Sequence, residues 1–397
     1  MIRGKAGACV AAAVALLGIT PPGAARAGDV RVHGLLDLAE SGTGEAVGLN
    51  TLYRGDTPFD AYRLRIFVDG RVSDHVQVYS EMLLDEAVGA RAMGAYASIT
   101  PWSGRDLHVL AGLIPWEIGT YAPRSYSDRN PLIGTPMMYQ YYTTLRSNEL
   151  PPSIDALLSV SGSGASGVTY KAGVSESPGM PLVYDQWWDF GVVATGSARP
   201  FEGALGFVNG SPSHPSPMRD ANSGKSVLGR VGLTPTAGTR FGLSASYGPY
   251  LSKSVAAQLP AGRSVNDYNQ TVAMADGEWS FGHVELRAEA IENVWQTPTV
   301  GDLRARDAYA EAKYTVLAGF YVAGRYERLR FGEAKDSTGA SLPWDTNWDR
   351  WELGAGYRLE RNALLKVAYQ RNLEHEADSA DVEDTYSLLS AQLSIRF

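Results

Sequence analysis

Apolar and polar residues alternate over much of this chain, and the alternation predicts β-strands. The clearest segments are 60–70, 305–316 and 348–360, each with one apolar and one polar face. Successive side chains of a strand point to opposite sides, so a period of two residues is the pattern expected of strands. Segment 60–70 carries Tyr62, Leu64, Ile66 and Val68 on its apolar face, opposite Arg63, Arg65 and Asp69.

The number of strands follows from applying this pattern along the whole chain. We count about eighteen candidate strands of roughly ten residues, the length that a tilted strand needs to cross a bilayer. The weakest candidates are 90–100, 154–162 and 201–211. The pattern therefore predicts an all-β fold, a transmembrane antiparallel up-and-down β-barrel, with 18 strands favoured. Sixteen strands is the alternative if two weak candidates are misread.

The connections between these strands alternate between long and short. Long connections are expected over residues 41–59, 117–153, 211–224, 249–267, 297–304, 333–347 and 373–383. Short turns are expected at Asp69-Gly70, residues 235–238, Phe281-Gly282 and Glu360-Arg361. Outer-membrane barrels show this asymmetry, with long external loops and short periplasmic turns. If both termini are periplasmic, the number of strands must be even.

The C-terminal segment is an alternating strand that stops on an aromatic residue. Its apolar face carries Leu389, Ala391, Leu393, Ile395 and Phe397, and its polar face carries Ser390, Gln392, Ser394 and Arg396. The polar face indicates contact with water on that side. A terminal Phe397 on such a strand resembles the C-terminal signature of bacterial outer-membrane β-barrel proteins. This resemblance implies that the apolar face contacts lipid.

Residues 1–27 have the pattern of a cleaved signal peptide. Arg3 and Lys5 precede an apolar stretch over residues 11–19, and Ala-Arg-Ala at 25–27 fits a small-x-small cleavage site. The alternative is a membrane anchor, but this stretch is short for the roughly 30 Å of hydrocarbon in a bilayer. We therefore expect export to the bacterial outer membrane and a single barrel domain over residues 28–397.

Removal of this segment changes both cysteine content and charge. Cys9 is the only cysteine, so the exported chain would have no disulfide, no cysteine metal site and no thiol nucleophile. The formal net charge falls from −8 to −11 because Arg3, Lys5 and Arg26 are removed. An acidic exported protein is a poor nucleic-acid binder. The expected partners are the lipid bilayer with its lipopolysaccharide, and small hydrophilic solutes.

Aromatic residues gather near the predicted strand ends. The chain has 21 Tyr and 9 Trp. The residues concerned are Trp116, Tyr121, Tyr184, Trp187, Trp188, Trp279, Trp295, Trp344, Trp348 and Trp351. Such rings suit the headgroup layers of a membrane, where one end of the side chain is apolar and the other forms hydrogen bonds.

The polar faces of the strands are the candidate lining of a pore. A barrel of sixteen to eighteen strands leaves an aqueous channel, whereas eight strands fill their interior with side chains. The candidates are Arg63, Arg65, Glu81, Asp85, Glu285, Arg287, Glu289, Glu311, Lys313, Arg325, Glu327, Arg350, Glu352, Arg358 and Lys366. A wall of mixed sign would select solutes by charge and size. The simpler alternative is that these charges are solvated or mutually paired.

The longest connection, 117–153, is rich in aromatics and prolines rather than in flexible polar residues. Loops of this length in a compact fold are usually functional. It follows the fifth predicted strand, which makes it the third external loop. If it folds inward it narrows the pore, and the residues that would face solutes are Arg124, Asp128, Arg129 and Arg146. The alternative is a loop packed over the rim of the barrel.

Several motifs resemble the phosphate-selective porin O and P family, most clearly after about residue 200. They are Asn222-x-Gly-Lys-x-Val-x-Gly-Arg230, Tyr247-Gly-Pro-Tyr250, Tyr309-x-Glu-x-Lys-Tyr314, Phe320-Tyr-Val-Ala-Gly-Arg-Tyr326, Trp351-Glu-Leu-Gly-Ala-Gly-Tyr357 and Leu365-Lys-Val-Ala-Tyr-Gln370. The resemblance implies a homotrimeric outer-membrane channel for small anions, and sixteen strands. A basic arc of Arg63, Arg65, Arg325, Arg350 and Arg358 would suit such a channel. Diffusion of small hydrophilic solutes, whether anions or cations, is the function that we predict.

The competing functions have less support in the sequence. A barrel enzyme needs a positioned nucleophile and base, but no Gly-x-Ser-x-Gly or His-x-x-x-His pattern occurs. No enzyme activity, cofactor or metal is therefore expected. A structural or adhesive barrel without an open pore is a further alternative. A plugged receptor barrel of about 22 strands would need a longer chain, and a soluble β-sandwich leaves the loop asymmetry unexplained.

Overall fold

The computed structural model describes residues 30–43, 58–85, 89–171, 173, 175–184, 188–217, 220–375 and 382–397. The predicted signal peptide at 1–27 lies outside the described residues. Parts of the predicted connections 41–59 and 373–383 also lie outside them.

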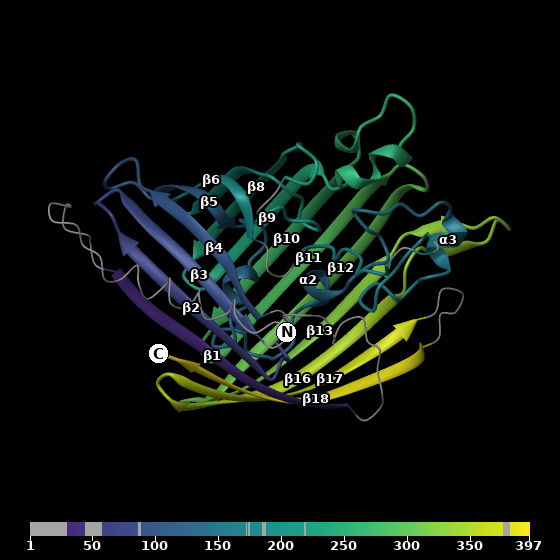
Figure 1. Ribbon diagram of the computed structural model, residues 1–397. Helices are drawn as coiled ribbons and strands as arrows, with labels where there is room; N and C mark the ends of the chain where they lie inside the picture. Colours follow the sequence, from purple (N-terminus) through teal and green to yellow (C-terminus); the bar gives the residue numbers. More distant parts are fainter. Residues whose placement is uncertain are drawn as a thin grey trace, which may run out of the picture.

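Sixteen strands form one closed antiparallel barrel within the described residues (Figure 1). They are β1 (Val30–Thr43), β2 (Tyr62–Arg71), β3 (Val76–Asp85), β4 (Gly89–Ile99), β5 (Leu107–Pro115), β6 (Trp188–Ala198), β7 (Phe201–Val208), β8 (Ser226–Thr236), β9 (Thr239–Pro249), β10 (Asn269–Phe281), β11 (Val284–Thr297), β12 (Gly301–Leu317), β13 (Phe320–Phe331), β16 (Asn347–Glu360), β17 (Ala363–His375) and β18 (Val382–Arg396). Neighbours in sequence are neighbours in the barrel, which makes this the predicted up-and-down topology.

The favoured count of eighteen barrel strands is wrong, and the alternative of sixteen is correct. Two of the weak candidates, 90–100 and 201–211, correspond to β4 and β7. The third, 154–162, begins instead with helix α3 (Ile154–Leu158), because the Ser153 side chain caps that helix by accepting from the Ala156 amide at 3.2 Å. Strands β14 (Glu333–Lys335) and β15 (Ser341–Pro343) pair only with each other, outside the barrel.

The two faces of the barrel wall have opposite character. Apolar side chains such as Tyr62, Leu353 and Leu389 are exposed on the outer face, at 45%, 59% and 57%. Polar side chains on the alternate positions, such as Arg63 and Glu352, are buried. A wall with its apolar face outward matches a barrel that lies in lipid, since the outward-facing band of such barrels is apolar.

The barrel closes where Phe397 meets β1. The Gly34 amide donates to the Phe397 carbonyl at 2.8 Å, and the Phe397 amide donates to the Gly34 carbonyl at 3.0 Å. A Cβ on residue 34 would lie 2.4 Å from the Phe397 ring, so the absence of a side chain at Gly34 gives the ring its place. The terminal aromatic residue therefore takes part in joining the first and last strands of the barrel.

The connections are mostly long at one end of the strands and short at the other. Two expected boundaries are wrong: β12 begins at Gly301, so residues 297–304 hold only a short link, and Asp69-Gly70 lies inside β2. The long connections carry the 3₁₀ helices η1 (Ala122–Arg124), η2 (Lys253–Gln258) and η3 (Val265–Asp267), and helices α2 (Met137–Gln140) and α3. No helix in the described residues has the length and apolar character needed to cross a membrane.

Candidate functional site: the barrel lumen

The connection between β5 and β6 is the dominant feature of the lumen. It spans residues 116–187, well beyond the predicted 117–153, and we refer to its described residues as the lumen loop. Its apolar residues, among them the almost fully buried Met137, Met138, Tyr139 and Tyr141, share one core with inward-facing residues of the strands. The loop contacts inward-facing residues of many strands, so it crosses the interior rather than covering the rim.

Glu289 on β11 is the main anchor of the start of this loop. Its carboxylate accepts from the backbone amide and hydroxyl of Thr120. It also accepts from the Tyr121 amide at 3.1 Å and from the Tyr139 hydroxyl at 2.7 Å. One buried carboxylate with four donors from the loop fixes this segment against the wall, because hydrogen bonds to charged groups are the stronger ones.

Further carboxylates on the same side repeat this arrangement. Glu352 on β16 accepts from the amides of Ile133 and Gly134 at 3.2 and 2.7 Å. Glu327 on β13 accepts from the Met137 amide at 2.6 Å. We use the name clamping wall for the strands whose inward-facing residues bond to the lumen loop, namely β11–β13, β16 and β17.

The basic residues of the clamping wall also bind the loop. Lys366 donates to the carbonyls of Ser127, Asn130 and Leu132 at 2.7, 3.2 and 2.9 Å. Arg325 donates to the Gly134 carbonyl at 2.8 Å and to the Glu352 carboxylate at 2.6 Å. These cations are covered by the loop, so they are not available to a solute that passes through the lumen.

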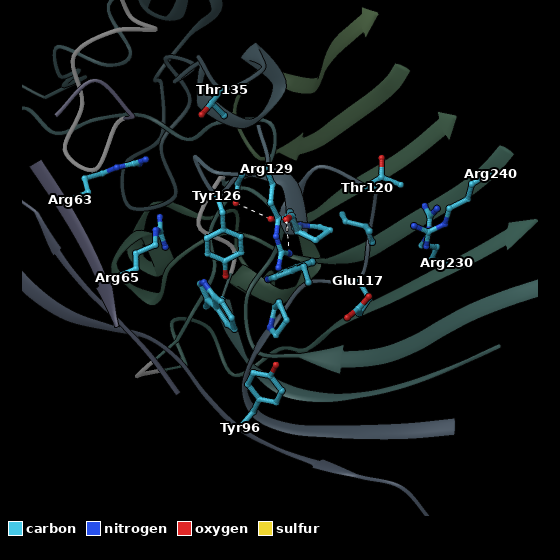
Figure 2. A pocket seen from close by; sticks show the side chains of 18 residues that line it. Arg63, Arg65, Tyr96, Glu117, Thr120, Tyr126, Arg129, Thr135, Arg230 and Arg240 are labelled. Carbon is cyan, nitrogen blue, oxygen red and sulfur yellow. Dashed lines mark hydrogen bonds between the residues drawn. The ribbon is translucent and has the colours of Figure 1, made fainter. Parts of the chain in front are cut away.

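A cavity of about 360 Å³ lies on the other side of the lumen loop. Five arginines contribute to its lining: Arg63 and Arg65 on β2, Arg230 on β8, Arg240 on β9, and Arg129 on the loop. Figure 2 shows the β2 pair on one side and Arg230 with Arg240 on the other, with Tyr126 and Arg129 between them. We call this space the arginine cavity.

Carboxylates beside the wall arginines hold them in place. Arg63 pairs with Asp37 at 3.1 Å, and Arg65 pairs with Glu81. Arg63 and Arg65 contribute to the cavity lining, whereas Asp37 and Glu81 do not.

The opposite side of the cavity repeats the pairing. Arg230 pairs with the buried Asp276, and Arg240 donates to Glu202 at 2.7 Å. In both pairs the arginine lines the arginine cavity and the carboxylate does not, although Glu202 lines the adjoining smaller cavity. Arg129 is exposed and has no carboxylate partner among the described residues.

Glu117 is the single carboxylate in the lining of the arginine cavity. Burial raises its pKa above the ordinary glutamate value, and the nearby Arg230 and Arg240 partly oppose that rise. Its charge is therefore sensitive to pH in a range where the arginines stay fully charged.

The placement of Arg230 depends on a glycine on the next strand. A Cβ on Gly242 would lie 2.2 Å from Nη2 of Arg230, so the guanidinium lies over the bare backbone of β9. This close approach brings Arg230 within reach of Asp276 on β10.

Two further cavities adjoin the arginine cavity. One of about 380 Å³, toward the long connections, shares Trp188 with it and is also lined by His214 and Pro217. The other, of about 190 Å³ and toward the short turns, shares Glu117, Arg230 and Arg240. Each of these two cavities shares lining residues with the arginine cavity, and all three include residues from the β6–β9 side of the barrel or its connections.

The predicted pore-lining residues therefore divide into three groups. Arg63 and Arg65 line the arginine cavity, with Glu81 beside them. Those in contact with the lumen loop are Glu289, Glu311, Glu327, Arg325, Arg350, Glu352 and Lys366. Of the rest, Glu285 accepts from Arg287 and Lys313, Asp85 pairs with Arg91 at 2.8 Å, and Arg358 is exposed and donates to the Arg361 carbonyl. The predicted basic arc is thus divided, because the lumen loop covers Arg325 and Arg350.

The four predicted loop residues also separate. Arg129 lines the cavity, whereas Arg124 pairs with Glu311 at 3.2 Å and Asp128 pairs with Arg396 at 2.7 Å. Arg146 pairs with Glu149 inside the loop itself.

Two cavity arginines are absent from the sequence-based pore lining, namely Arg230 and Arg240. The sequence does place both arginines on strands that flank the predicted turn at 235–238, and this position could have marked them as candidates for the lining. In the described residues, no group of three or more His, Cys, Asp or Glu side chains is arranged to hold a metal ion.

Comparison with known proteins shows the fold. No family model matches the chain, and no curated protein matches its sequence. Among solved structures it is similar to in-vitro folded OmpT, an outer-membrane protein of Vibrio cholerae (TM-score 0.57, 11% identity, 93% of this chain and 97% of that chain). It is also similar to Salmonella typhi OmpF in complex with daunomycin (0.56, 12%, 93% and 97%).

A third similar structure is an anion-selective porin from Comamonas acidovorans (0.54, 10%, 93% and 99%). At such low identity these likenesses establish a porin-type barrel fold for nearly the whole described chain.

Proposed function

We propose that this chain is an outer-membrane porin that forms a water-filled channel for passive diffusion of small hydrophilic solutes, with a preference for anions. The observation that carries the proposal is the arginine cavity, in which guanidinium groups from β2, β8, β9 and the lumen loop surround one space. The porin-type fold supports it, as does the wide interior expected for sixteen strands.

The preference for anions follows from the orientation of the ion pairs. A guanidinium that lies between its carboxylate partner and the cavity presents its positive end to a solute. Fixed positive charges that line a confined aqueous space attract anions and repel cations, although the chain as a whole is acidic. The local arrangement therefore decides selectivity. The resemblance to phosphate-selective porins agrees with a preference for small anions.

The location and assembly of the channel belong to the same proposal. The exposed apolar outer face suits a bilayer, and the signal peptide at 1–27 would direct export to the bacterial outer membrane, whose lipopolysaccharide would surround the long connections. OmpT of Vibrio cholerae, which has a similar fold, has also been solved in a trimer form. We propose a homotrimer for this chain by analogy. We propose no enzymatic role.

Planar-bilayer recording tests the proposal. In a salt gradient, the zero-current potential of the inserted barrel should indicate that chloride passes more readily than potassium. Replacing the two more exposed cavity arginines (Arg129→Gln with Arg240→Gln) should lower the ratio of anion to cation permeability by about threefold.

The matched control is Arg304→Gln, because Arg304 is exposed and pairs only with Glu292, which lies outside all three cavities. This control should leave the ratio unchanged. A correctly inserted barrel that passes no ions would contradict the channel and favour a structural or adhesive barrel, or an enzyme.

A further inference from the structure

We propose that the preferred solutes are monoanions with a flat apolar body, of which simple aromatic carboxylates are the type. This inference rests on the proposed channel function and names the solute class of the same cavity. Its basis is that the arginine cavity is lined by aromatic rings as well as by guanidinium groups. The rings are Tyr96, Trp116, Tyr126 and Trp188.

The rings are held in place before any solute arrives. Trp188 packs against Tyr96 with ring centroids 6.3 Å apart, and Tyr96 stacks on Tyr79 at 5.2 Å. A Cβ on Gly94 would lie 2.5 Å from the Trp188 ring, so that ring lies flat over the backbone of β4. Rings fixed in this way offer apolar contact area at little cost in conformational entropy.

Two guanidinium groups already lie over one ring in this cavity. Arg65 and Arg129 lie over the Tyr126 ring at 5.3 and 5.7 Å, and the Tyr126 hydroxyl donates to Glu81 at 2.8 Å. Arginine both stacks on aromatic faces and binds a carboxylate with two parallel hydrogen bonds. A flat acid can therefore bind a guanidinium through its carboxylate while its ring contacts a neighbouring aromatic residue.

Hydrogen-bond donors without acceptors surround the cavity. Nε of Arg63, Arg65 and Arg230 and the indole Nε1 of Trp116 are buried without a hydrogen-bond partner among the described residues. These four atoms are buried, so a carboxylate in the cavity would bind the charged ends of the lining arginines rather than these donors. Glu117 lies in the same lining. Because its charge repels a second negative group, the lining favours one negative charge over two.

The size of the space also suits a single ring. The arginine cavity of about 360 Å³ adjoins the cavity of about 380 Å³ through Trp188, and Tyr142 and Tyr184 line the latter. Volumes in this range are typical of sites for small organic molecules. Inorganic phosphate or chloride would contact the arginines but make no use of the rings.

The test compares two acids of equal charge and similar size, benzoate and cyclohexanecarboxylate, on the full-length barrel in a planar bilayer. Each is added to a chloride solution, and the concentration that halves the chloride current is measured. Benzoate should halve the current at a concentration about fivefold lower than cyclohexanecarboxylate, because only benzoate is flat enough to stack. Trp188→Leu should remove most of this difference, and Trp188→Phe should retain part of it.

Trp351→Leu is the matched control, because that ring lies on the outer face and should have no effect. Equal half-blocking concentrations for the two acids in the wild-type channel, together with anion preference, overturn the inference and leave the proposed function standing. A barrel that passes no ions overturns both. If Trp188→Leu fails to fold, the two acids in the wild-type channel still decide the question.

Discussion

The two sides of the lumen carry similar residues but use them differently. The clamping wall has arginines, a lysine and several glutamates, and these are bonded to the lumen loop or to one another. The wall that faces the arginine cavity has arginines paired with carboxylates beside them, and these arginines line the cavity together with Tyr126 and Arg129 of the lumen loop. The difference shows that a count of inward charges does not predict selectivity, because the path of the loop decides which charges a solute meets.

The comparison also accounts for an acidic chain with a basic cavity. Glu289, Glu327 and Glu352 contribute to the negative net charge, yet their oxygens accept from amides of the lumen loop. The loop amides cover these carboxylate oxygens, so a solute in the lumen does not contact them. Of the arginines opposite, Arg129 and Arg240 are the more exposed, whereas Arg63, Arg65 and Arg230 line the cavity from largely buried positions.

Deletion of residues 122–148 should change the difference between the two walls more than any other variant. Without this part of the loop the clamping wall becomes exposed, and both walls should then line one wide channel. Single-channel conductance should rise at least about twofold, and the anion preference should fall because the glutamates become accessible. Shortening the β14–β15 hairpin, which lies outside the barrel, is the control and should change neither value. An unchanged conductance after the loop deletion would show that the loop does not limit the pore.

A smaller effect is expected from Glu289→Ala. Buried donors on Thr120, Tyr121 and Tyr139 would lose their acceptor, and each such loss costs about 1–3 kcal/mol. Hydrogen exchange of amides 118–140 should become faster by more than tenfold, while exchange in the barrel strands stays slow. Glu292→Ala is the matched control on the same strand, because Glu292 is exposed and bonds only to Arg304 and Arg306. Equal exchange in both variants would argue against the clamp.

The smallest expected effect concerns pH and Glu117. Its pKa is raised by burial, so lowering the pH from 8 toward 5 should neutralise Glu117 before an ordinary glutamate and increase the preference for anions. Glu117→Gln should have the higher preference throughout this range and a weaker dependence on pH. The zero-current potential at each pH measures both. His108 lines the adjoining cavity in the wild type and in Glu117→Gln alike. A difference in pH dependence between these two proteins is therefore due to Glu117. The same pH dependence in both would assign the effect to another group.

The sequence predicts the wall of this barrel well and its interior poorly. Alternation correctly places Arg63, Arg65 and Glu352 opposite their apolar neighbours, because strand geometry alone fixes which side chains share a face. It does not show which inward residues lie near one another across the lumen. Arg230 and Arg240 lie far from Arg63 in sequence, and only closure of the barrel and the path of the loop bring them to one cavity.

The lumen loop shows the same limit. Its position as the third external loop, after β5, follows from the order of the strands, but the predicted length is too short because 154–162 has the pattern of a weak strand. Its packing core around Met137 and Tyr139 has no repeating pattern, since the loop fills an irregular space rather than a layer. Its anchors are backbone amides, which every sequence contains.

The contact between Phe397 and Gly34 has a consequence for the order of folding. These residues are separated by almost the full described length of the chain, and bringing them together has a high cost in loop-closure entropy. Until they meet, β1 and β18 are both open edges that can pair with other chains. The pairing of Phe397 and β18 with β1 therefore ends the period in which the barrel can aggregate. A loss of Phe397 should accordingly reduce the yield of folded barrels more than the stability of a barrel that has already closed.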